Sequence, residues 1–145
     1  MLDLRRVSDD FAVAPQIAVS DLAAVSRGGY AMVISNRPDG EEAGQPSAAE
    51  IAAAAAEAGL AFRHIPVAGG FAQGQVEAMA DALAQTGVPV FAFCRSGTRS
   101  TLLWSLAQAS RGGDPEAIAT AAASAGYDIA PVRAAVEQLA GRQRN

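Results

Sequence analysis

Short runs of consecutive apolar residues alternate along this chain with longer segments in which apolar residues recur every three to four positions. Short apolar runs bounded by turn residues are typical of strands that are buried on both faces of a parallel sheet. Pro15 interrupts the first run, which predicts an edge strand because proline cannot donate a hydrogen bond to a neighbouring strand. We expect strands at 11–13 with 16–18, at 30–35, at 60–66 and at 88–93.

Helix signals fill the intervals between these runs. Ser47 with Glu50 forms a capping box, and Asp114 followed by Pro115 is a typical helix start. The alternation of strands and helices predicts an α/β fold, with a mostly parallel central sheet of four to five strands and helices on both faces. Ligands of such sheets bind beyond the carboxyl ends of the strands. We expect helices at 21–27, 47–57, 73–86, 101–110, 114–124 and 131–140.

Length and composition narrow the possible classes of protein. A chain of 145 residues suits one domain, which we expect to span 1–145 with frayed ends at 1–10 and 141–145. The net charge of −4 disfavours nucleic acid as a partner. Because no apolar run reaches the roughly 18 residues of a membrane span, we expect no membrane partner and a cytoplasmic location. The oligomeric state stays open.

A single cysteine limits the chemistry further. It excludes an internal disulfide and a cysteine-based zinc site, so we expect neither a structural metal nor a cofactor. It also leaves Cys94 without a second thiol in the chain. A reaction that passes sulfur on from Cys94 would therefore need an external thiol acceptor.

The stretch 88–103 joins an apolar strand, a polar loop and a helical segment without interruption, and Cys94 stands at the start of the loop. In such a turn the backbone N–H groups can converge on one spot, and the helix directs its positive end at the same place. These surroundings favour the thiolate form of a cysteine. We therefore interpret Cys94 as a nucleophile that faces an oxyanion site.

Two neighbours extend this interpretation. Arg99 offers a planar fork of donors that fits two oxygens of a phosphoryl group and stabilises charge in its transition state. Ser100 could donate a hydrogen bond to the sulfur, so Cys94, Arg99 and Ser100 are the predicted catalytic residues. The residues predicted to bind the oxyanion or substrate are the rest of the loop, Arg95, Ser96, Gly97 and Thr98.

Three blocks of sequence together resemble one bacterial family. The first runs from Val33 to Glu42 with Gln45-Pro46, the second is His-Ile-Pro-Val at 64–67, and the third is the loop 94–100. The combination is similar to the beta-lactamase-hydrolase-like, phosphatase-like family over about residues 11–109. The resemblance implies a dual-specificity-phosphatase-like fold and, in different family members, phosphatase or sulfurtransferase activity. The loop alone is also similar to that of the rhodaneses.

The chain departs from the phosphatase pattern at three points. Four residues separate Cys94 from Arg99 where the phosphatases have five, so the loop is closer in size to that of a rhodanese. Phe93 stands where the phosphatases have a histidine, and 68–70 reads Ala-Gly-Gly where the dual-specificity enzymes place a general-acid aspartate. The candidate replacements for that acid are Asp39, Glu41 and Glu42.

Three functions remain compatible with these residues. The first, which we expect, is a cysteine-dependent phosphatase that hydrolyses a small phosphorylated substrate through a phosphocysteine intermediate. The second is a sulfurtransferase that carries a Cys94 persulfide from a sulfane-sulfur substrate to an external thiol. The third is a non-catalytic oxyanion-binding or redox-sensing module in which Cys94 is oxidised.

Other chemically active residues have simpler interpretations. Arg37 with Glu41 and Glu42 forms either a solvated ion pair on the surface or a cluster that lines the pocket. The only histidine, His64, is expected to be structural, because no spacing brings it next to the cysteine. The only tryptophan, Trp104, is expected in the core.

Overall fold

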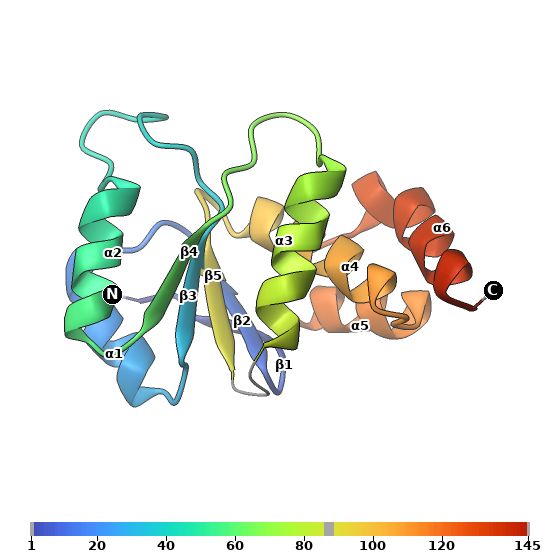
Figure 1. The fold of residues 1–145 in the computed structure, drawn as a ribbon, viewed down its shortest axis with the longest axis horizontal. Helices are drawn as coiled ribbons and strands as arrows, with labels where there is room; N and C mark the ends of the chain where they lie inside the picture. The colour runs from blue at the N-terminus through green and yellow to red at the C-terminus, as the bar shows by residue number, and fades with distance from the viewer. Residues whose placement is uncertain (1, 86–88, 145) are drawn as a thin grey trace.

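The structure, a computed structural model, describes residues 2–85 and 89–144. The described strands form one five-stranded sheet in the order β1-β2-β5-β3-β4 (Figure 1). β1 is antiparallel to β2 and the remaining pairs are parallel, which confirms the expected α/β fold with a mostly parallel sheet. The strands are β1 Arg5–Ser8, β2 Phe11–Ala14, β3 Met32–Ser35, β4 Ala61–His64 and β5 Val90–Phe93.

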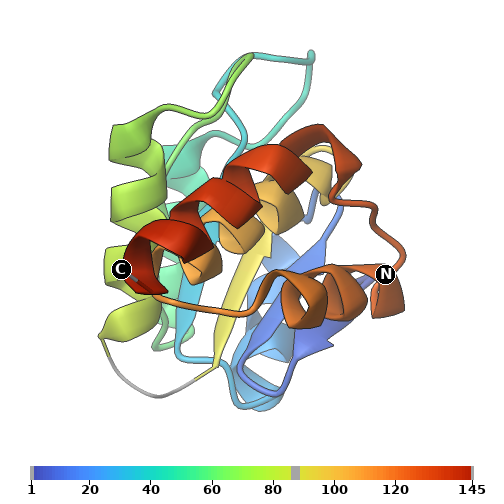
Figure 2. The ribbon, with the colours of Figure 1, turned by 90° about the vertical axis from the view of Figure 1, so that its right-hand side faces the viewer.

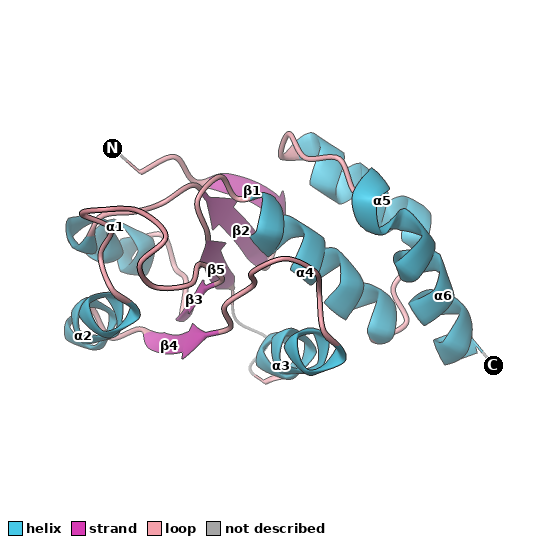
Figure 3. Ribbon diagram, turned by 90° about the horizontal axis from the view of Figure 1, so that it is seen from above, coloured by secondary structure: helices cyan, strands magenta, loops and turns pink. Residues whose placement is uncertain are grey.

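Helices cover both faces of this sheet (Figures 1 and 3). α1 and α2 lie on one face and α3 and α4 on the other, while α5 and α6 form an outer layer over α4, as Figure 2 shows. Short 3₁₀ turns, η1 Val19–Asp21 and η2 Ala130–Val132, precede α1 and α6. The helices are α1 Leu22–Arg27, α2 Ala48–Glu57, α3 Gln73–Ala84, α4 Thr98–Ser110, α5 Pro115–Ser124 and α6 Arg133–Arg144.

The central strand β5 is apolar throughout because both of its faces are covered. Alternate side chains of a strand point to opposite faces of the sheet. Phe91 and Phe93 accordingly join the apolar cluster beneath α1 and α2, whereas Val90 and Ala92 join the larger cluster beneath α3 and α4. All four side chains are buried, which explains the uninterrupted apolar run in the sequence.

The three central parallel strands end level with one another. Phe93, the last residue of β5, is in register with Ala14 of β2 and Ser35 of β3. The backbone N–H of Asn36 then donates to the Phe93 carbonyl at 2.9 Å, which extends the pairing one residue into the loop. The segments that follow these strands therefore emerge side by side at one edge of the sheet, where ligands of parallel sheets bind.

α4, which follows β5, lies between the sheet and the outer helices and is buried on nearly all sides. Two of its buried hydroxyl groups bond to the backbone one turn earlier: Thr101 donates to the Gly97 carbonyl and Ser105 to the Thr101 carbonyl, each at 2.9 Å. Trp104 lies in the core, as expected, and stacks on Phe11 with ring centroids 5.5 Å apart. α4 is thus a fixed base for the loop that precedes it.

Several boundaries differ from those that the sequence predicts. Within the expected frayed segment 1–10, Arg5–Ser8 forms the strand β1, and β1 covers β2 so that β2 is not an edge strand. Pro15 lies just beyond β2, where its missing N–H costs no hydrogen bond between strands. Residues 16–18 form no strand. The last helix, expected to end at residue 140 before a frayed segment 141–145, continues as α6 to Arg144, and residue 145 lies outside the described residues.

α4 begins three residues before the expected position 101. Gly97 has a left-handed φ of 91° and acts as the N-cap, so the helix follows directly from Thr98. The loop between β5 and α4 is correspondingly tight. Residues 86–88 lie outside the described residues, so the expected end of the helix at 86 and the expected start of the strand at 88 are not described.

Candidate active site

Cys94 lies at the carboxyl end of the central strand and faces the start of α4. The side chain is fully buried, and its sulfur accepts a hydrogen bond of 3.1 Å from the backbone N–H of Gly97. α4 begins at the next residue, so the positive end of a 13-residue helix lies beside the same sulfur. The sulfur thus lies where a backbone N–H group and the N-terminus of a helix converge, which is the arrangement that the sequence predicts.

Arg99 connects this loop to two others. Its Nη1 donates to Glu41 Oε2 at 2.8 Å and to the Val67 carbonyl at 2.7 Å, and its Nη2 donates to Glu41 Oε1 at 2.8 Å. These three hydrogen bonds use three of the five N–H groups of the guanidinium. Cys94 is also among the groups that raise the pKa of Arg99, after Glu41 as the first cause, so guanidinium and sulfur lie close together.

Glu41 is held by two arginines. Hydrogen bonds from Arg99, and to a smaller extent from Arg37, together lower the pKa of Glu41 from its usual 4.5 to about 2, although burial opposes the shift. Arg37 is itself buried, and donates to Glu41 at 3.0 Å and to Gln16 at 2.9 Å. The interpretation of this cluster as a solvated ion pair on the surface is therefore wrong. The cluster instead fixes Arg99, the arginine of the loop.

The other predicted loop residues divide into buried and exposed groups. Ser100 is fully buried, and its Oγ has no hydrogen-bond partner among the described residues, which leaves a donor available beside the loop. Ser96 and Thr98 are exposed and bond to each other at 3.0 Å. Arg95 is exposed as well, and its carbonyl accepts from the Gln16 N–H at 3.2 Å. The structure thus brings Cys94, Arg99 and the backbone of the loop together, but leaves the Arg95 side chain outside.

The three candidate acids occupy different positions. Asp39 accepts a hydrogen bond of 2.8 Å from the Ala48 N–H and so caps α2. Glu42 is largely exposed and receives a long contact of 3.4 Å from Arg37. Only Glu41 contacts the arginine of the loop, and its low pKa makes it a carboxylate at neutral pH. His64 is structural in its contacts, with Nε2 2.9 Å from the Arg37 carbonyl.

Tyr127 contacts the loop, and no sequence pattern predicts this contact. Its hydroxyl donates to the Ser96 carbonyl at 2.9 Å and accepts from Arg5 Nη1 at 2.9 Å. A methyl group added at Gly97 would lie only 2.1 Å from the Tyr127 hydroxyl oxygen. A tyrosine after a helix-ending glycine carries no periodic signal, so only the fold reveals this contact.

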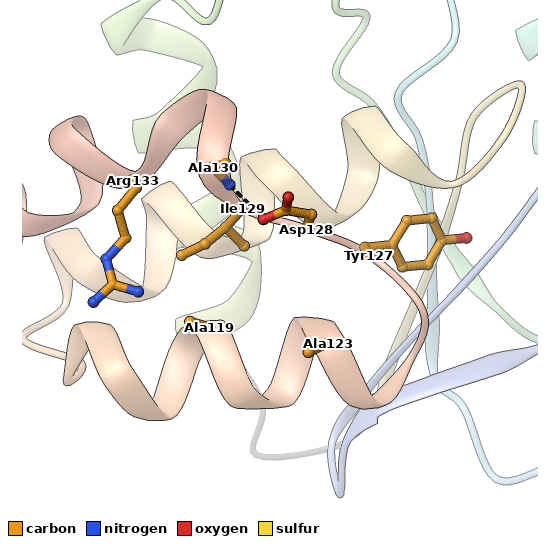
Figure 4. A pocket seen from close by; sticks show the side chains of 7 residues that line it. All are labelled: Ala119, Ala123, Tyr127, Asp128, Ile129, Ala130 and Arg133. Carbon is orange, nitrogen blue, oxygen red and sulfur yellow. Dashed lines mark hydrogen bonds between the residues drawn. The ribbon is translucent and has the colours of Figure 1, made fainter.

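Two cavities lie away from Cys94. One of about 460 Å³ lies between α5 and the start of α6 and is lined by Tyr127 and Arg133 (Figure 4). The other, of about 440 Å³, lies between α3, α4 and α6. Within the described residues no group of three His, Cys, Asp or Glu side chains could hold a metal ion.

Comparison with known proteins decides the family. Residues 3–111 match the model of the beta-lactamase hydrolase-like protein, phosphatase-like domain. The chain belongs to this family, as the resemblance implied. A beta-lactamase hydrolase-like protein of Agrobacterium fabrum is 35% identical over 105 residues, which are 72% of this chain and 24% of the relative. The matched part thus spans about a quarter of the length of that relative.

Comparison with solved structures identifies the fold class of this phosphatase-like domain. A candidate phosphatase of Neisseria meningitidis has a TM-score of 0.79 at 31% identity, covering 93% of this chain and 96% of its own. The kinase associated phosphatase has a TM-score of 0.69 at 13% identity, covering 99% and 94%, and shows the fold alone. The fold is therefore that of the dual-specificity and tyrosine phosphatases. In the described part, no helix is long and apolar enough to cross a membrane.

Proposed function

We propose that this phosphatase-like domain is a cysteine-dependent phosphatase. The Cys94 thiolate attacks phosphorus, a sulfur–phosphorus bond forms, and the bond from phosphorus to the leaving oxygen breaks. Water then attacks the phosphocysteine, which releases inorganic phosphate and restores the thiolate. The hydrogen bond of 3.1 Å from the Gly97 N–H to the sulfur, at the start of α4, is the observation that carries this proposal.

Arg99 has a suitable arrangement for binding the phosphoryl group. Glu41 and Val67 engage three of its N–H groups, so two remain for phosphoryl oxygens. A guanidinium that is hydrogen bonded along one edge keeps a fixed orientation and presents its other edge to a bound group. Donors fixed in this way stabilise the charge that develops in a transition state. Glu41 thereby acts as the residue that positions Arg99.

The arrangement of the carboxylates supports one class of substrate. Glu41 is ionised at neutral pH, Asp39 caps a helix, and Glu42 is largely exposed with a 3.4 Å contact to Arg37, so none of the three is held where it would donate a proton to a leaving group. Without such a donor, hydrolysis needs a leaving group that departs as an anion. We therefore propose aryl phosphates, or phosphates esterified to another phosphate, as substrates and not simple alkyl phosphates.

An assay with an aryl phosphate tests the proposal. The wild-type protein should release phosphate and should show a mass increase of one phosphoryl group when the reaction is quenched during turnover. Cys94→Ser should lose activity by about 10⁴-fold or more, as is usual when a nucleophile is removed. Ser26→Ala, a change on α1 away from the loop, serves as the control and should retain activity.

The short loop supports a second candidate function, sulfurtransfer. The Cys94 thiolate would attack the outer sulfur of thiosulfate, the sulfur–sulfur bond would break, and sulfite would leave. An external thiol would then take the outer sulfur from the Cys94 persulfide as its own persulfide, restoring the thiolate. A mass increase of one sulfur without phosphate release would contradict the phosphatase proposal. Inactivity with both substrates would instead support an oxyanion-binding or redox-sensing module.

A further inference from the structure

We propose that Tyr127 and Arg5 form a positioning pair that fixes the Ser96–Gly97 peptide group, so that its N–H faces the Cys94 sulfur. Tyr127 lies outside the matched residues 3–111, and Arg5 belongs to the first strand. The inference rests on the proposed function only in treating Cys94 as a nucleophile.

The peptide group between Ser96 and Gly97 is hydrogen bonded on both sides. Its carbonyl accepts from the Tyr127 hydroxyl at 2.9 Å, and its N–H donates to the Cys94 sulfur at 3.1 Å. A trans peptide group is planar, with its C=O and N–H pointing in opposite directions. The hydroxyl on one side therefore determines where the N–H points on the other.

Gly97 makes such a constraint necessary. Its φ of 91° lies in the left-handed region, where glycine moves readily between backbone conformations because it has no Cβ. A peptide group next to glycine can rotate at low cost, and rotation would turn the Ser96 carbonyl towards the sulfur. A carbonyl oxygen at that position would repel a thiolate and an oxyanion alike. The Tyr127 hydrogen bond opposes this rotation.

Tyr127 is held in place from the opposite end of the chain. Arg5 donates to its hydroxyl at 2.9 Å and lies 5.5 Å from the centre of its ring. Asp3 in turn pairs with Arg5 at 2.7 Å. Burial raises the pKa of Tyr127, so the hydroxyl keeps the proton that it donates to Ser96. The ring extends from the segment between α5 and η2, away from Arg133 (Figure 4).

The rate of Cys94 alkylation by iodoacetamide, measured across pH, tests this role directly. Tyr127→Phe keeps the ring and removes the hydroxyl, and should slow alkylation at pH 7 by about three- to tenfold, the effect of one neutral hydrogen bond. The pH of half-maximal rate should move upward. Tyr30→Phe is the matched control, because Tyr30 packs edge-on against Phe91 in the other apolar cluster, and should behave as wild type.

The charged and titratable groups around Cys94 come from several elements of the fold. Arg99 approaches it from α4 and Tyr127 from the segment after α5, with Glu41 and Arg5 behind them. Arg5→Gln keeps Tyr127 intact but removes its support, so it should slow alkylation in the same direction by a smaller factor. Arg6→Gln, on the same strand, is its control.

An alkylation profile of Tyr127→Phe that coincides with the wild-type profile, in a protein with the wild-type melting temperature, would overturn the inference. An equal slowing in Tyr30→Phe would also overturn it, because the effect would then be general loosening of the fold. Should Tyr127→Phe fail to fold, the comparison of the Arg5 and Arg6 variants decides in the same way. Because alkylation needs no turnover, a wild type that releases no phosphate would contradict the proposed function without affecting this result.

Discussion

At the scale of single residues, the site depends on which N–H groups of the Arg99 guanidinium are hydrogen bonded to other parts of the protein. Glu41 takes the end of the guanidinium through two bonds of 2.8 Å, and the Val67 carbonyl takes a third N–H. Arg37, buried beneath, holds Glu41 from the other side. A carboxylate beside an oxyanion site weakens anion binding by charge, but here it also fixes the group that binds the anion.

Removing the charge of Glu41 should therefore impair catalysis. Glu41→Gln weakens two charge-assisted hydrogen bonds to Arg99, and we expect kcat with an aryl phosphate to fall about tenfold or more, since such bonds are worth about 1.5–3 kcal/mol. Glu42→Gln is the matched control, because Glu42 is largely exposed and contacts Arg37 only at 3.4 Å. Its kcat should stay close to that of wild type, and equal losses in both variants would contradict the assignment to Glu41.

The low pKa of Glu41 should also appear as a dependence of stability on pH. A carboxyl group whose pKa falls from 4.5 to about 2 on folding stabilises the native state above pH 4.5. This contribution is lost as the pH falls from 4.5 towards 2. The urea midpoint of wild type should exceed that of Glu41→Gln at pH 6, and the difference should shrink over this range. A difference that is constant with pH would show that the charge of Glu41 is not the cause.

At the scale of elements, the start of α2 explains the position of Asp39. Ser47 and Glu50 form the capping box that the sequence predicts, with reciprocal bonds of 3.1 Å. Asp39 adds a third bond, accepting from the Ala48 N–H at 2.8 Å. Its role is to join the loop after β3 to α2.

Replacing Asp39 should accordingly change stability and not proton transfer. Asp39→Ala removes one hydrogen bond at the helix start, and we expect a loss of about 1 kcal/mol in the free energy of unfolding. The acidic limb of the pH–rate profile with an aryl phosphate should match that of wild type. A flattened acidic limb would instead identify Asp39 as the general acid.

At the scale of the whole molecule, the last two helices complete the core although the family match ends at residue 111. Ile118 of α5 and Val136 of α6 are buried in the cluster that also contains Trp104 of α4. Removing both helices would expose the apolar outer side of α4 to water. The phosphatase-like unit of this chain therefore includes α5 and α6.

A chain that ends at residue 111 should not fold to the native state. Trp104 stacks on Phe11 at 5.5 Å, and this packing should give the full-length protein a near-ultraviolet circular dichroism signal. We expect the shortened chain to lose that signal and to bind a hydrophobic dye, because apolar area becomes exposed. A native-like signal in the shortened chain would show that the matched residues form an independent unit.

The sequence was sufficient for features that depend on local pattern. The apolar run of β5, the capping box at Ser47 and the loop around Cys94 each carry their signal within a few residues. β1 was missed because a four-residue strand with Arg5 and Arg6 has no apolar run, and its place depends on pairing with β2. The choice between surface pair and pocket for Arg37 also needed the fold, since burial of a guanidinium depends on how loops close over it.

Tyr127 could not be identified for a related reason. Its contact with Ser96 joins residues 31 positions apart, and its contact with Arg5 joins residues 122 positions apart. Spacing within a motif says nothing about such pairs. They arise only where β1, the loop after β5 and the segment after α5 meet in space.

The strand order has a consequence for how the protein is made. β2 and β3 do not pair with each other. Each pairs with β5, which is the last of the described strands in chain order. We therefore expect β1–β2 and β3–β4 to remain two separate parts of the sheet during synthesis, until β5 has left the ribosome. Cys94 directly follows β5, so we expect the thiol to reach its position beside α4 only after β5 has joined the two parts.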